Sequence, residues 1–428
     1  MSDRPAVWFH TFGCKANQYD TERIRQELEL RGATTAPALA VADVAVINTC
    51  TVTNQADANA RQLVRRLRRQ RPDLRIVVAG CSTAFREAEY RALRESEDVD
   101  GIVPGHDPVD VARELPGLAG FDAGSRAGVA PLERNARGTR AWLKIQDGCD
   151  RKCSFCATRI ARGASVSRSP EEVAAEAAIL ARVHPEIVIT GIHIGHYGRD
   201  LEPGVTLADL CRRLLERVPA RLRLSSIEAT EIDDRLVDLV VESGGRLAPH
   251  LHVPLQSGSD RVLRLMRRWH TREAYRSRVL DIADRVGAMG LGADIIVGFP
   301  GEGEDEFEET RALVEELPFT YLHVFPYSVR DGTVAATLPD RVTGDVAAAR
   351  SRVLRNLGLR KGRAYEASRV GQVADIVVEG SDDRVLGVTG DYLKVGLSGG
   401  AAPGDRFSAP LGGSAGRLVA RAPAAAVV

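Results

Sequence analysis

The stretch "AWLKIQDGCDRKCSFC", residues 141–156, joins an apolar run of strand length to three closely spaced cysteines, Cys149, Cys153 and Cys156, here called the barrel triplet. In a parallel α/β sheet or barrel, the loop that follows a strand lies at the edge where ligands bind. The stretch holds neither a fourth cysteine nor a histidine. It therefore predicts a site with three thiol ligands at the end of a strand.

Strand-like and helix-like segments alternate after this stretch. Residues 170–183 and 305–317 are two of the segments with helical character. This alternation is typical of βα units that build a parallel sheet. With residues 141–146 as the first strand, we predict six units in a partial or complete barrel, whose further strands are residues 186–190, 222–226, 250–255, 292–299 and 321–327.

The N-terminal part repeats one pattern three times. The apolar runs "AVWFHTFGC", "DVAVINTC" and "LRIVVAGC" end at Cys14, Cys50 and Cys81, here called the N-terminal triplet. Helix-like segments at residues 19–31 and 54–70 separate the runs, which predicts a parallel α/β sheet. Because right-handed crossovers bring the strand C-terminal ends to one edge, we expect the three cysteines to converge there. The alternative is three unrelated buried cysteines.

Changes in sequence character divide the chain. Residues 117–138 are rich in Gly and Ala and lack periodicity, which is typical of a linker. After a helical stretch at residues 346–367, short alternating runs broken by Gly and Asp predict a small antiparallel β-barrel or sandwich. We expect an α/β protein with an N-terminal parallel α/β domain at residues 1–116, a central (β/α)6 partial barrel at 139–365 and an all-β domain at 366–428.

Composition limits the classes of protein. The chain has 428 residues, which suggests two or three domains, and its 58 basic residues balance 58 acidic ones. No global charge attracts nucleic acid or membrane, so a polyanion has to be bound by local patches. The sequence shows no secretory leader and no apolar stretch of about 18 residues that would span a bilayer. We expect a cytoplasmic protein that makes no membrane contact.

The cysteine count favours iron–sulfur clusters. Seven cysteines in a chain of this size are more typical of metal binding or catalysis than of disulfides. Structural zinc needs four protein ligands, whereas a cubane held by three thiolates keeps one iron open for a substrate or cofactor. The two triplets are therefore predicted to hold two [4Fe–4S] clusters. The seventh cysteine, Cys211, has the spacing of a buried helix face in "LADLCRRLL" and is predicted to be core.

These motifs resemble the radical S-adenosylmethionine methylthiotransferases. The Cys-x3-Cys-x2-Cys spacing with an aromatic before the last cysteine resembles radical S-adenosylmethionine enzymes, and "GCKANQYDTE", "NTCTVTN" and "VAGC" resemble the N-terminal domain of the methylthiotransferases. Further similar motifs are "LHVPLQSGSDRVLRLMRR" and "DIIVGFPGE", and the C-terminal segment looks like a TRAM domain. The motifs "HTFGCKANQYDTE", "INTCTVTN", "SSIEATEI" and "LHVFPYS" look most like the subgroup that acts on threonylcarbamoyladenosine in tRNA.

The resemblance implies a reaction and its cofactors. The expected activity inserts a methylthio group at carbon 2 of the modified adenosine 3′ of the anticodon. The barrel-triplet cluster would bind S-adenosylmethionine and, once reduced, cleave it to a 5′-deoxyadenosyl radical, while the N-terminal-triplet cluster would hold the sulfur. The implied partners are tRNA and an electron donor such as flavodoxin or ferredoxin. The sulfur source stays unknown.

The resemblance also implies residues around S-adenosylmethionine. Phe155 is expected near its adenine, with core filling as the alternative. Thr190 and Gly191, after the second barrel strand, are candidates for contact with its amino group. His193 and His196 in the same loop are interpreted as ordinary polar residues. The remaining candidates follow later strands or lie in the Gly-rich motif, and they are Ser226, Glu228, Ile296 and Gly298.

Clustered arginines predict where RNA binds. Within residues 54–70, four arginines form a stripe distinct from the apolar one, and this helix begins just after Cys50. Arginines beside a polynucleotide neutralise phosphates, although a solvated cationic face is the alternative. The four are Arg61, Arg65, Arg68 and Arg69, and a second candidate group is Arg264, Arg267 and Arg268.

Three alternative functions stay open. Two lie within the family and act on isopentenyladenosine in tRNA or on an aspartate of a ribosomal protein. The third is a non-catalytic RNA-binding protein that holds metal for structure alone. The open coordination position that a three-thiolate site leaves argues against the third.

Overall fold

The protein is described from a computed structural model, over residues 4–51, 54–115, 117–118, 130–136, 138–202, 204–381, 384–414 and 417–423. Its contacts divide the chain into two compact units. The first unit comprises Met1–Ala136, Asp147–Lys152 and Cys156–Val166, and the second comprises Arg137–Gln146, Cys153–Phe155 and Ser167–Val428. The barrel and the C-terminal strands thus share a unit. The domain bounds 1–116, 139–365 and 366–428 stay predictions, and most of the linker 117–138 lies outside the described residues.

The first unit is built on a parallel five-stranded sheet, as the repeated pattern predicts. The strand order is β2-β1-β3-β4-β5, and every pairing is parallel. The strands are β1 (Ala6–Thr11), β2 (Thr34–Thr35), β3 (Val44–Thr49), β4 (Arg75–Gly80) and β5 (Gly101–Ile102). The helices are α1 (Lys15–Leu30), α2 (Asn54–Gln70), α3 (Cys81–Phe85), α4 (Glu87–Glu95), α5 (Pro108–Arg113) and α6 (Thr158–Arg162).

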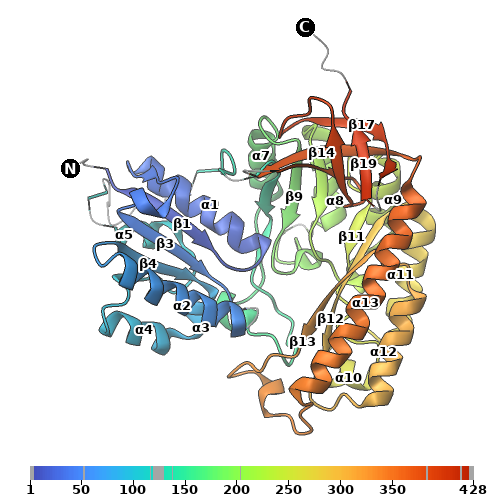
Figure 1. Cartoon of the computed structure of the whole chain (residues 1–428), viewed down its shortest axis with the longest axis horizontal. Coiled ribbons are helices and arrows are strands. Elements are labelled where there is room, and N and C mark those ends of the chain that lie inside the picture. The colour runs from blue at the N-terminus through green and yellow to red at the C-terminus, as the bar shows by residue number, and fades with distance from the viewer. Residues whose placement is uncertain are drawn as a thin grey trace. The chain divides into compact units, whose positions relative to one another are not determined.

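Alternating strand residues form two apolar layers on the faces of this sheet. On one face Val46 and Val77 pack with residues of α1 and α5. On the other face Ile47 and Val78 pack with residues of α2 and α4. Figure 1 shows α1 on one side of β1, β3 and β4 and α2 on the other. Because both faces are covered, the strands are almost uniformly apolar.

The barrel of the second unit contains the six predicted parallel strands in sequential order. Two three-stranded sheets, β6-β9-β10 and β11-β12-β13, are joined by a parallel bridge between Ser226 and His252. The strands are β6 (Ala141–Lys144), β9 (Glu186–Thr190), β10 (Arg221–Leu224), β11 (His250–His252), β12 (Gly290–Val297) and β13 (Tyr321–Pro326), next to a short β7 (Gln146–Asp147) and β8 (Val166–Ser167). The structure therefore confirms the predicted βα architecture.

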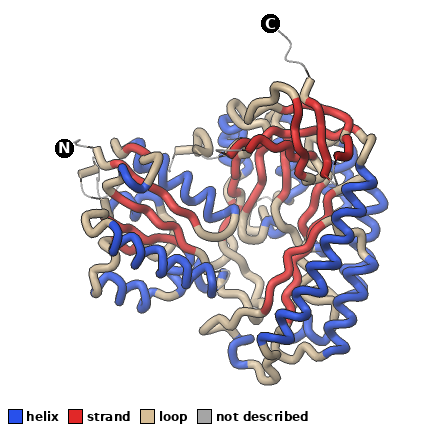
Figure 2. Tube along the Cα trace, in the orientation of Figure 1, coloured by secondary structure: helices blue, strands red, loops and turns tan. Residues whose placement is uncertain are grey.

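Helices follow the barrel strands, and local capping explains where several of them begin. They are α7 (Pro170–Leu180), α8 (Leu207–Arg217), α9 (Asp234–Glu242), α10 (Asp260–Leu265), α11 (Arg272–Val286), α12 (Glu304–Glu316) and α13 (Gly344–Arg369). Ser169 and Glu172 form a capping box at α7, and Thr206 and Asp209 form one at α8. Figure 2 shows the long helices running beside the barrel strands. No helix within the described ranges is long and apolar enough to cross a membrane.

The C-terminal strands form a six-stranded sheet in the order β17-β14-β15-β16-β19-β18. They are β14 (Val373–Ser381), β15 (Arg384–Thr389), β16 (Lys394–Ser398), β17 (Arg406–Pro410), β18 (Gly412–Ser414) and β19 (Arg417–Arg421). The pairings are antiparallel, as predicted, except that β16 and β19 pair in parallel, with Gly396 opposite Val419. Adjacent hairpin strands pair antiparallel, whereas β19 reaches β16 after two intervening strands and arrives in the same direction.

Candidate active site

The N-terminal triplet lies at the C-terminal ends of three neighbouring strands. Cys14 follows β1 and directly precedes α1, Cys50 follows β3, and Cys81 follows β4 as the first residue of α3. Helix α1 begins four residues earlier than the sequence predicts, because Cys14 itself takes the extended backbone of an N-cap residue.

Close packing draws these strand ends together. A Cβ at Gly13, whose φ is +98°, would lie 2.4 Å from the Sγ of Cys50. Asn17 on α1 donates to the carbonyl of Phe12 at 2.9 Å and to that of Thr49 at 2.6 Å. The first turn of α1 is thereby tied to the ends of β1 and β3, with glycine required where the chain meets the cysteine.

Cys81 is a buried thiol that stays neutral until a metal binds it. Burial raises the pKa of the Cys81 thiol to about 12, Arg162 acts against this rise, and Cys14 and Cys50 add to it. A buried thiol of this kind ionises when a metal binds it. Cys14 and Cys50 affect the pKa of Cys81 because the three thiols lie near one another.

The sulfurs of the N-terminal triplet are not gathered as tightly as the ligands of a single metal ion. Among the described residues, three groups of ligand atoms lie within 4.8 Å of one another, and none contains a cysteine. The three sulfurs are thus spread wider than one zinc ion requires. Cys14 is exposed while Cys50 and Cys81 are buried, so the triplet opens on one side. By ligand count, three thiols would hold three irons of a cubane and leave the fourth open.

A buried arginine that sequence reasoning missed joins this site. Arg162, at the end of α6, donates from Nε to the Sγ of Cys81 at 3.0 Å, and its side chain is 1% exposed. It also pairs with Asp20 at 2.7 Å and with Asp147 at 2.9 Å. Attraction to the surrounding carboxylates and thiols outweighs burial and keeps the pKa of Arg162 well above its usual value. No local pattern in "ATRIARG" signals this contact, since Cys81 lies 81 residues away.

Two cysteines of the barrel triplet belong to the first unit. The N–H of Cys149 donates to the carbonyl of Gly163 at 3.1 Å, and the N–H of Thr158 donates to the Sγ of Cys156 at 3.4 Å. Gly148 has a φ of +67°, and a Cβ there would lie 1.8 Å from the carbonyl oxygen of Ala164. Glycine therefore lets the loop turn back on itself next to Cys149.

The third barrel cysteine and its neighbours belong to the second unit. Arg268 donates from Nη1 to the Sγ of Cys153 at 3.7 Å and pairs with Glu228. The side chain of Arg268 is 3% exposed and stacks on Trp269 at 4.2 Å. Attraction to Glu228 and Cys153 outweighs burial and raises the pKa of Arg268 above its usual value. Glu228 pairs with Arg268 in the structure, and its predicted contact with the cofactor stays a prediction.

Several predicted cofactor residues gather at the ends of β12 and β13. Phe155 and Ile296 pack against one apolar cluster that includes Phe299, whose ring centroid lies 6.4 Å from that of Phe155. Gly298 has a φ of +72°, and a Cβ there would lie 2.7 Å from the Cβ of Ala347. Phe155 is thus partly buried against this cluster, and packing against Ala347 together with the positive φ requires glycine at position 298. The predicted contacts of Phe155, Ile296 and Gly298 with S-adenosylmethionine stay predictions.

The other predicted cofactor residues lie at the ends of β9 and β10. Thr190 ends β9 and is buried, and Ser226, beyond β10, is exposed. A Cβ at Gly191 would lie 2.8 Å from the carbonyl oxygen of Gln146, so local packing alone requires this glycine. The roles of these residues toward S-adenosylmethionine stay predictions.

The four arginines of α2 do not form one free face. Arg61 pairs with the buried Asp57 at 2.6 Å, and Arg68 pairs with Asp100 at 2.5 Å. In contrast, the side chain of Arg65 is 61% exposed with a carboxylate only at 3.9 Å, and Arg69 is exposed. In the second group, Arg264 and Arg267 are exposed whereas Arg268 is buried.

Two histidine clusters were not anticipated. His193 and His196, interpreted from the sequence as ordinary loop residues, both direct Nε2 at Glu231, at 2.7 and 3.0 Å. On the barrel strands, His252 and His323 flank Asp294 at 2.9 and 3.2 Å. Both histidines hold the pKa of Asp294 well below its usual range, against the effect of burial. Strand alternation places His252, Asp294 and His323 on one face of the sheet, but which of them meet depends on the register of the strands.

Two family models match the chain. The Radical SAM superfamily model matches residues 143–314, which include the barrel triplet. The model named Uncharacterized protein family UPF0004 matches residues 6–103, which include the N-terminal triplet. The fold and the cysteines thus define a radical S-adenosylmethionine protein with a second cysteine-bearing domain.

Curated relatives extend over nearly the whole chain. The threonylcarbamoyladenosine tRNA methylthiotransferase MtaB of Bacillus subtilis (strain 168) is 38% identical over 92% of this chain and 90% of its own. The protein of the same name from Aquifex aeolicus (strain VF5) is 33% identical over 92% and 97%. The tRNA-2-methylthio-N(6)-dimethylallyladenosine synthase of Staphylococcus aureus (strain MRSA252) is 33% identical over 90% and 78%. The chain belongs to the radical S-adenosylmethionine methylthiotransferase family.

Among solved structures, the cobalamin-dependent S-adenosylmethionine radical enzyme OxsB, with aqua-cobalamin and S-adenosylmethionine bound, matches 82% of this chain and 55% of its own. The TM-score is 0.49 at 13% identity.

Proposed function

We propose that this protein transfers a methylthio group to carbon 2 of N6-threonylcarbamoyladenosine in tRNA. One observation carries the proposal, namely the 38% identity with the Bacillus subtilis MtaB protein over 92% of this chain and 90% of the relative. The similarity extends over most of both chains. The same relationship makes the protein an enzyme and sets aside the non-catalytic alternative.

Methylthiolation of dimethylallyladenosine in tRNA is the second candidate. The Staphylococcus aureus synthase is 33% identical, and this chain covers 78% of its length against 97% for the Aquifex aeolicus MtaB protein. The covered length favours the threonylcarbamoyl substrate, and so does the 38% identity of the Bacillus subtilis protein, since the Aquifex aeolicus and Staphylococcus aureus proteins are equally identical at 33%. We find no observation that favours a ribosomal-protein aspartate.

Each cysteine triplet would hold one [4Fe–4S] cluster, and the barrel cluster would also hold S-adenosylmethionine. These groups, when bound, supply the radical and the methylthio group. The chain would contribute thiolates, the buried Arg162 and Arg268 directed at two of the sulfurs, and the apolar cluster around Phe299 against which Phe155 packs. Glu302 fixes the Gly-rich turn by accepting from the N–H of Gly298 at 2.9 Å and from Arg350 at 2.6 Å.

Exposed arginines would contact the tRNA. Arg65 and Arg69 on α2 and Arg264 and Arg267 after β11 are exposed, so their charges are accessible to phosphates. Arg61, Arg68 and Arg268 have carboxylate partners and serve the fold first. The reaction also needs a one-electron donor of the flavodoxin or ferredoxin class, and its expected compartment is the cytoplasm, where tRNA is found.

The test is a substrate comparison. Full-length protein reconstituted anaerobically with iron and sulfide is incubated with S-adenosylmethionine, dithionite and tRNA carrying either threonylcarbamoyladenosine or dimethylallyladenosine. Nucleosides are then analysed by mass spectrometry. We expect the methylthio product from the first tRNA. A product from the second tRNA alone would replace the proposal with the second candidate, and no product from either, with both clusters present and S-adenosylmethionine cleaved, would refute both.

A further inference from the structure

The guanidinium of Arg162 is directed at a sulfur ligand as well as at carboxylates. It lies six residues beyond Cys156 and is enclosed within the first unit, where its side chain is 1% exposed. Burying a charge is costly unless its hydrogen-bonding groups are satisfied. The partners that surround this cation should therefore reveal its role.

Each part of the guanidinium has a different partner. Nη2 donates to the Oδ2 of Asp20 at 2.7 Å and to the Oδ1 of Asn17 at 2.5 Å. Nη1 donates to the carboxylate of Asp147 at 2.9 and 3.0 Å. Nε donates to the Sγ of Cys81 at 3.0 Å. The side chain thus connects Cys81, the first turns of α1 and the residue that opens the loop of Cys149.

A second buried arginine in the same unit shows what a purely structural role looks like. Arg25 is 4% exposed, and its Nε donates to the carboxylate of Glu22 at 3.2 Å. Its Nη1 donates to Thr35, and the guanidinium lies 4.2 Å from the ring centroid of Phe9. These partners are a carboxylate, a hydroxyl and a ring. Arg162 differs in donating to a cysteine sulfur.

We propose that Arg162 is a positioning residue that holds Cys81 as a cluster ligand and raises the reduction potential of the cluster bound by the N-terminal triplet. One-electron reduction adds a negative charge to a cluster, and a nearby cation with a hydrogen bond to the ligand sulfur stabilises that added charge. The inference rests on the proposed function, since that function requires the second cluster.

The charges around Arg162 support a raised reduction potential. The two carboxylates that Arg162 meets, Asp20 and Asp147, are 1% and 24% exposed, and His106 lies 2.9 Å from Asp147. Without Arg162, these carboxylates would add to the negative field around the thiolate of Cys81. The cation therefore offsets a field that would otherwise oppose electron entry.

The experiment isolates one cluster in the full-length protein. The barrel cysteines are replaced by alanine (Cys149→Ala, Cys153→Ala and Cys156→Ala), and the remaining cluster is titrated with dithionite in the presence of mediators while its signal is followed by electron paramagnetic resonance. Iron content and circular dichroism are measured on each sample. Arg162→Gln removes the cation, Arg162→Lys keeps the charge without the planar fork, and Arg25→Gln is the matched buried control.

We expect Arg162→Gln to lower the equilibrium constant for reduction at least tenfold, which corresponds to about 59 mV toward negative potential for one electron. Arg162→Lys should recover part of the shift, and Arg25→Gln should leave the potential unchanged. An unchanged potential in folded, iron-loaded Arg162→Gln, or an equal shift in Arg25→Gln, would overturn the inference. If folded Arg162→Gln loses iron and Arg25→Gln does not, the result would support the inference that Arg162 holds Cys81 as a cluster ligand.

A compensated variant covers the case in which Arg162→Gln does not fold. The double variant Asp20→Asn with Arg162→Gln removes a buried cation and a buried anion together, and it is compared with Asp20→Asn alone. The double variant should have the more negative potential, and equal potentials would overturn the inference. Failure of the proposed function is distinguishable, because the parent protein without barrel cysteines would then contain no iron–sulfur cluster to titrate.

Discussion

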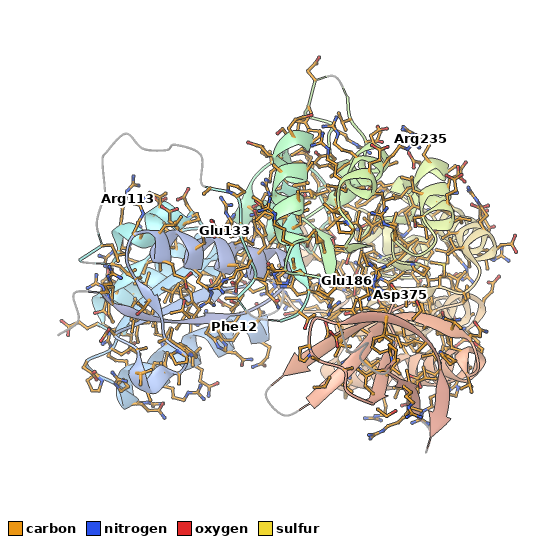
Figure 3. The ribbon with its side chains drawn as sticks, turned by 90° about the horizontal axis from the view of Figure 1, so that it is seen from above. Phe12, Arg113, Glu133, Glu186, Arg235 and Asp375 are labelled. Atoms are coloured by element: carbon orange, nitrogen blue, oxygen red, sulfur yellow. The ribbon has the colours of Figure 1, made fainter. Side chains whose placement is uncertain are left out.

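Glu186 on β9 accepts two hydrogen bonds from Arg223 on β10, each of 2.9 Å, and both side chains are fully buried. Arg221, equally buried, also pairs with Glu186 and donates to the carboxylate of Asp375 at 2.9 Å. Arg223 donates further to the carbonyls of the turn after β15. Figure 3 labels Glu186 and Asp375 close together where barrel strands meet the C-terminal sheet. This charge network fastens the C-terminal sheet to the barrel.

Replacing Glu186 should therefore destabilise the second unit. Glu186→Gln leaves Arg221 and Arg223 buried with an uncompensated charge, for which we expect a loss of roughly 3–5 kcal/mol in the free energy of unfolding. Urea unfolding at pH 7 followed by circular dichroism measures the loss. Glu171→Gln is the control, since Glu171 is 71% exposed and pairs with Arg213 at the surface. Equal midpoints for the two variants would contradict the role given to this network.

The same network predicts an acid-sensitive contribution to stability. Burial alone would raise the pKa of Glu186, but Arg223 and Arg221 hold this pKa well below its usual range. The contribution is complete above the unfolded pKa of about 4.3 and is lost as pH falls below it. The stability difference between wild type and Glu186→Gln should therefore narrow when unfolding is measured at pH 3.5 instead of pH 7. A constant difference would show that Glu186 protonation is not involved.

The two cysteine triplets should be separable by mutation. Cys149→Ala should abolish reductive cleavage of S-adenosylmethionine, because the barrel cluster loses a ligand. Cys50→Ala should leave that cleavage largely intact while ending methylthio transfer. The measurements are 5′-deoxyadenosine and methylthio nucleoside by mass spectrometry, with iron content as the control. Loss of cleavage in Cys50→Ala with a fully assembled barrel cluster would invert the assigned roles.

Cys211 should not be a ligand. Its side chain is fully buried on α8, and burial raises the pKa of its thiol to about 12, so it stays a neutral apolar group. Cys211→Ala should keep the iron content and the activity of the wild type, with a modest loss of stability from the missing sulfur. Iron analysis of the purified variant tests whether Cys211 is a ligand. Loss of about half the iron would make Cys211 a ligand.

The arginines of α2 should divide into two pairs with different effects. Arg65→Gln with Arg69→Gln should weaken tRNA binding and flatten its salt dependence by about 0.7–0.9 in log–log slope for each phosphate that is no longer neutralised. Arg61→Gln with Arg68→Gln should instead lower stability, because Asp57 and Asp100 each lose one arginine partner. Affinity at several salt concentrations and thermal unfolding are measured for both. If the folded Arg65→Gln with Arg69→Gln variant keeps the wild-type salt dependence of tRNA affinity, the arginines of α2 form a solvated cationic face and do not contact RNA.

Local patterns in the chain were enough to predict most of the architecture. Apolar runs that end in cysteine predicted β1, β3 and β4, and alternating segments predicted the six barrel strands. The predicted helix at residues 54–70 coincides with α2. These predictions succeed because the periodicity of strands and helices and the handedness of crossovers are local properties of the sequence. The same reasoning placed Cys14, Cys50 and Cys81 at one sheet edge.

Pairing of charges was decided only by the tertiary structure. Arg162 meets Cys81 across 81 residues of chain, and Arg223 meets the turn after β15 across more than twice that separation. Arg268 and Glu228, predicted from the sequence to contact RNA and the cofactor, form an ion pair that no local pattern indicates. A stripe of arginines is visible in a sequence, but which of them is neutralised depends on the carboxylates that folding brings near. Long-range electrostatic contacts depend on packing and register, which no local pattern contains.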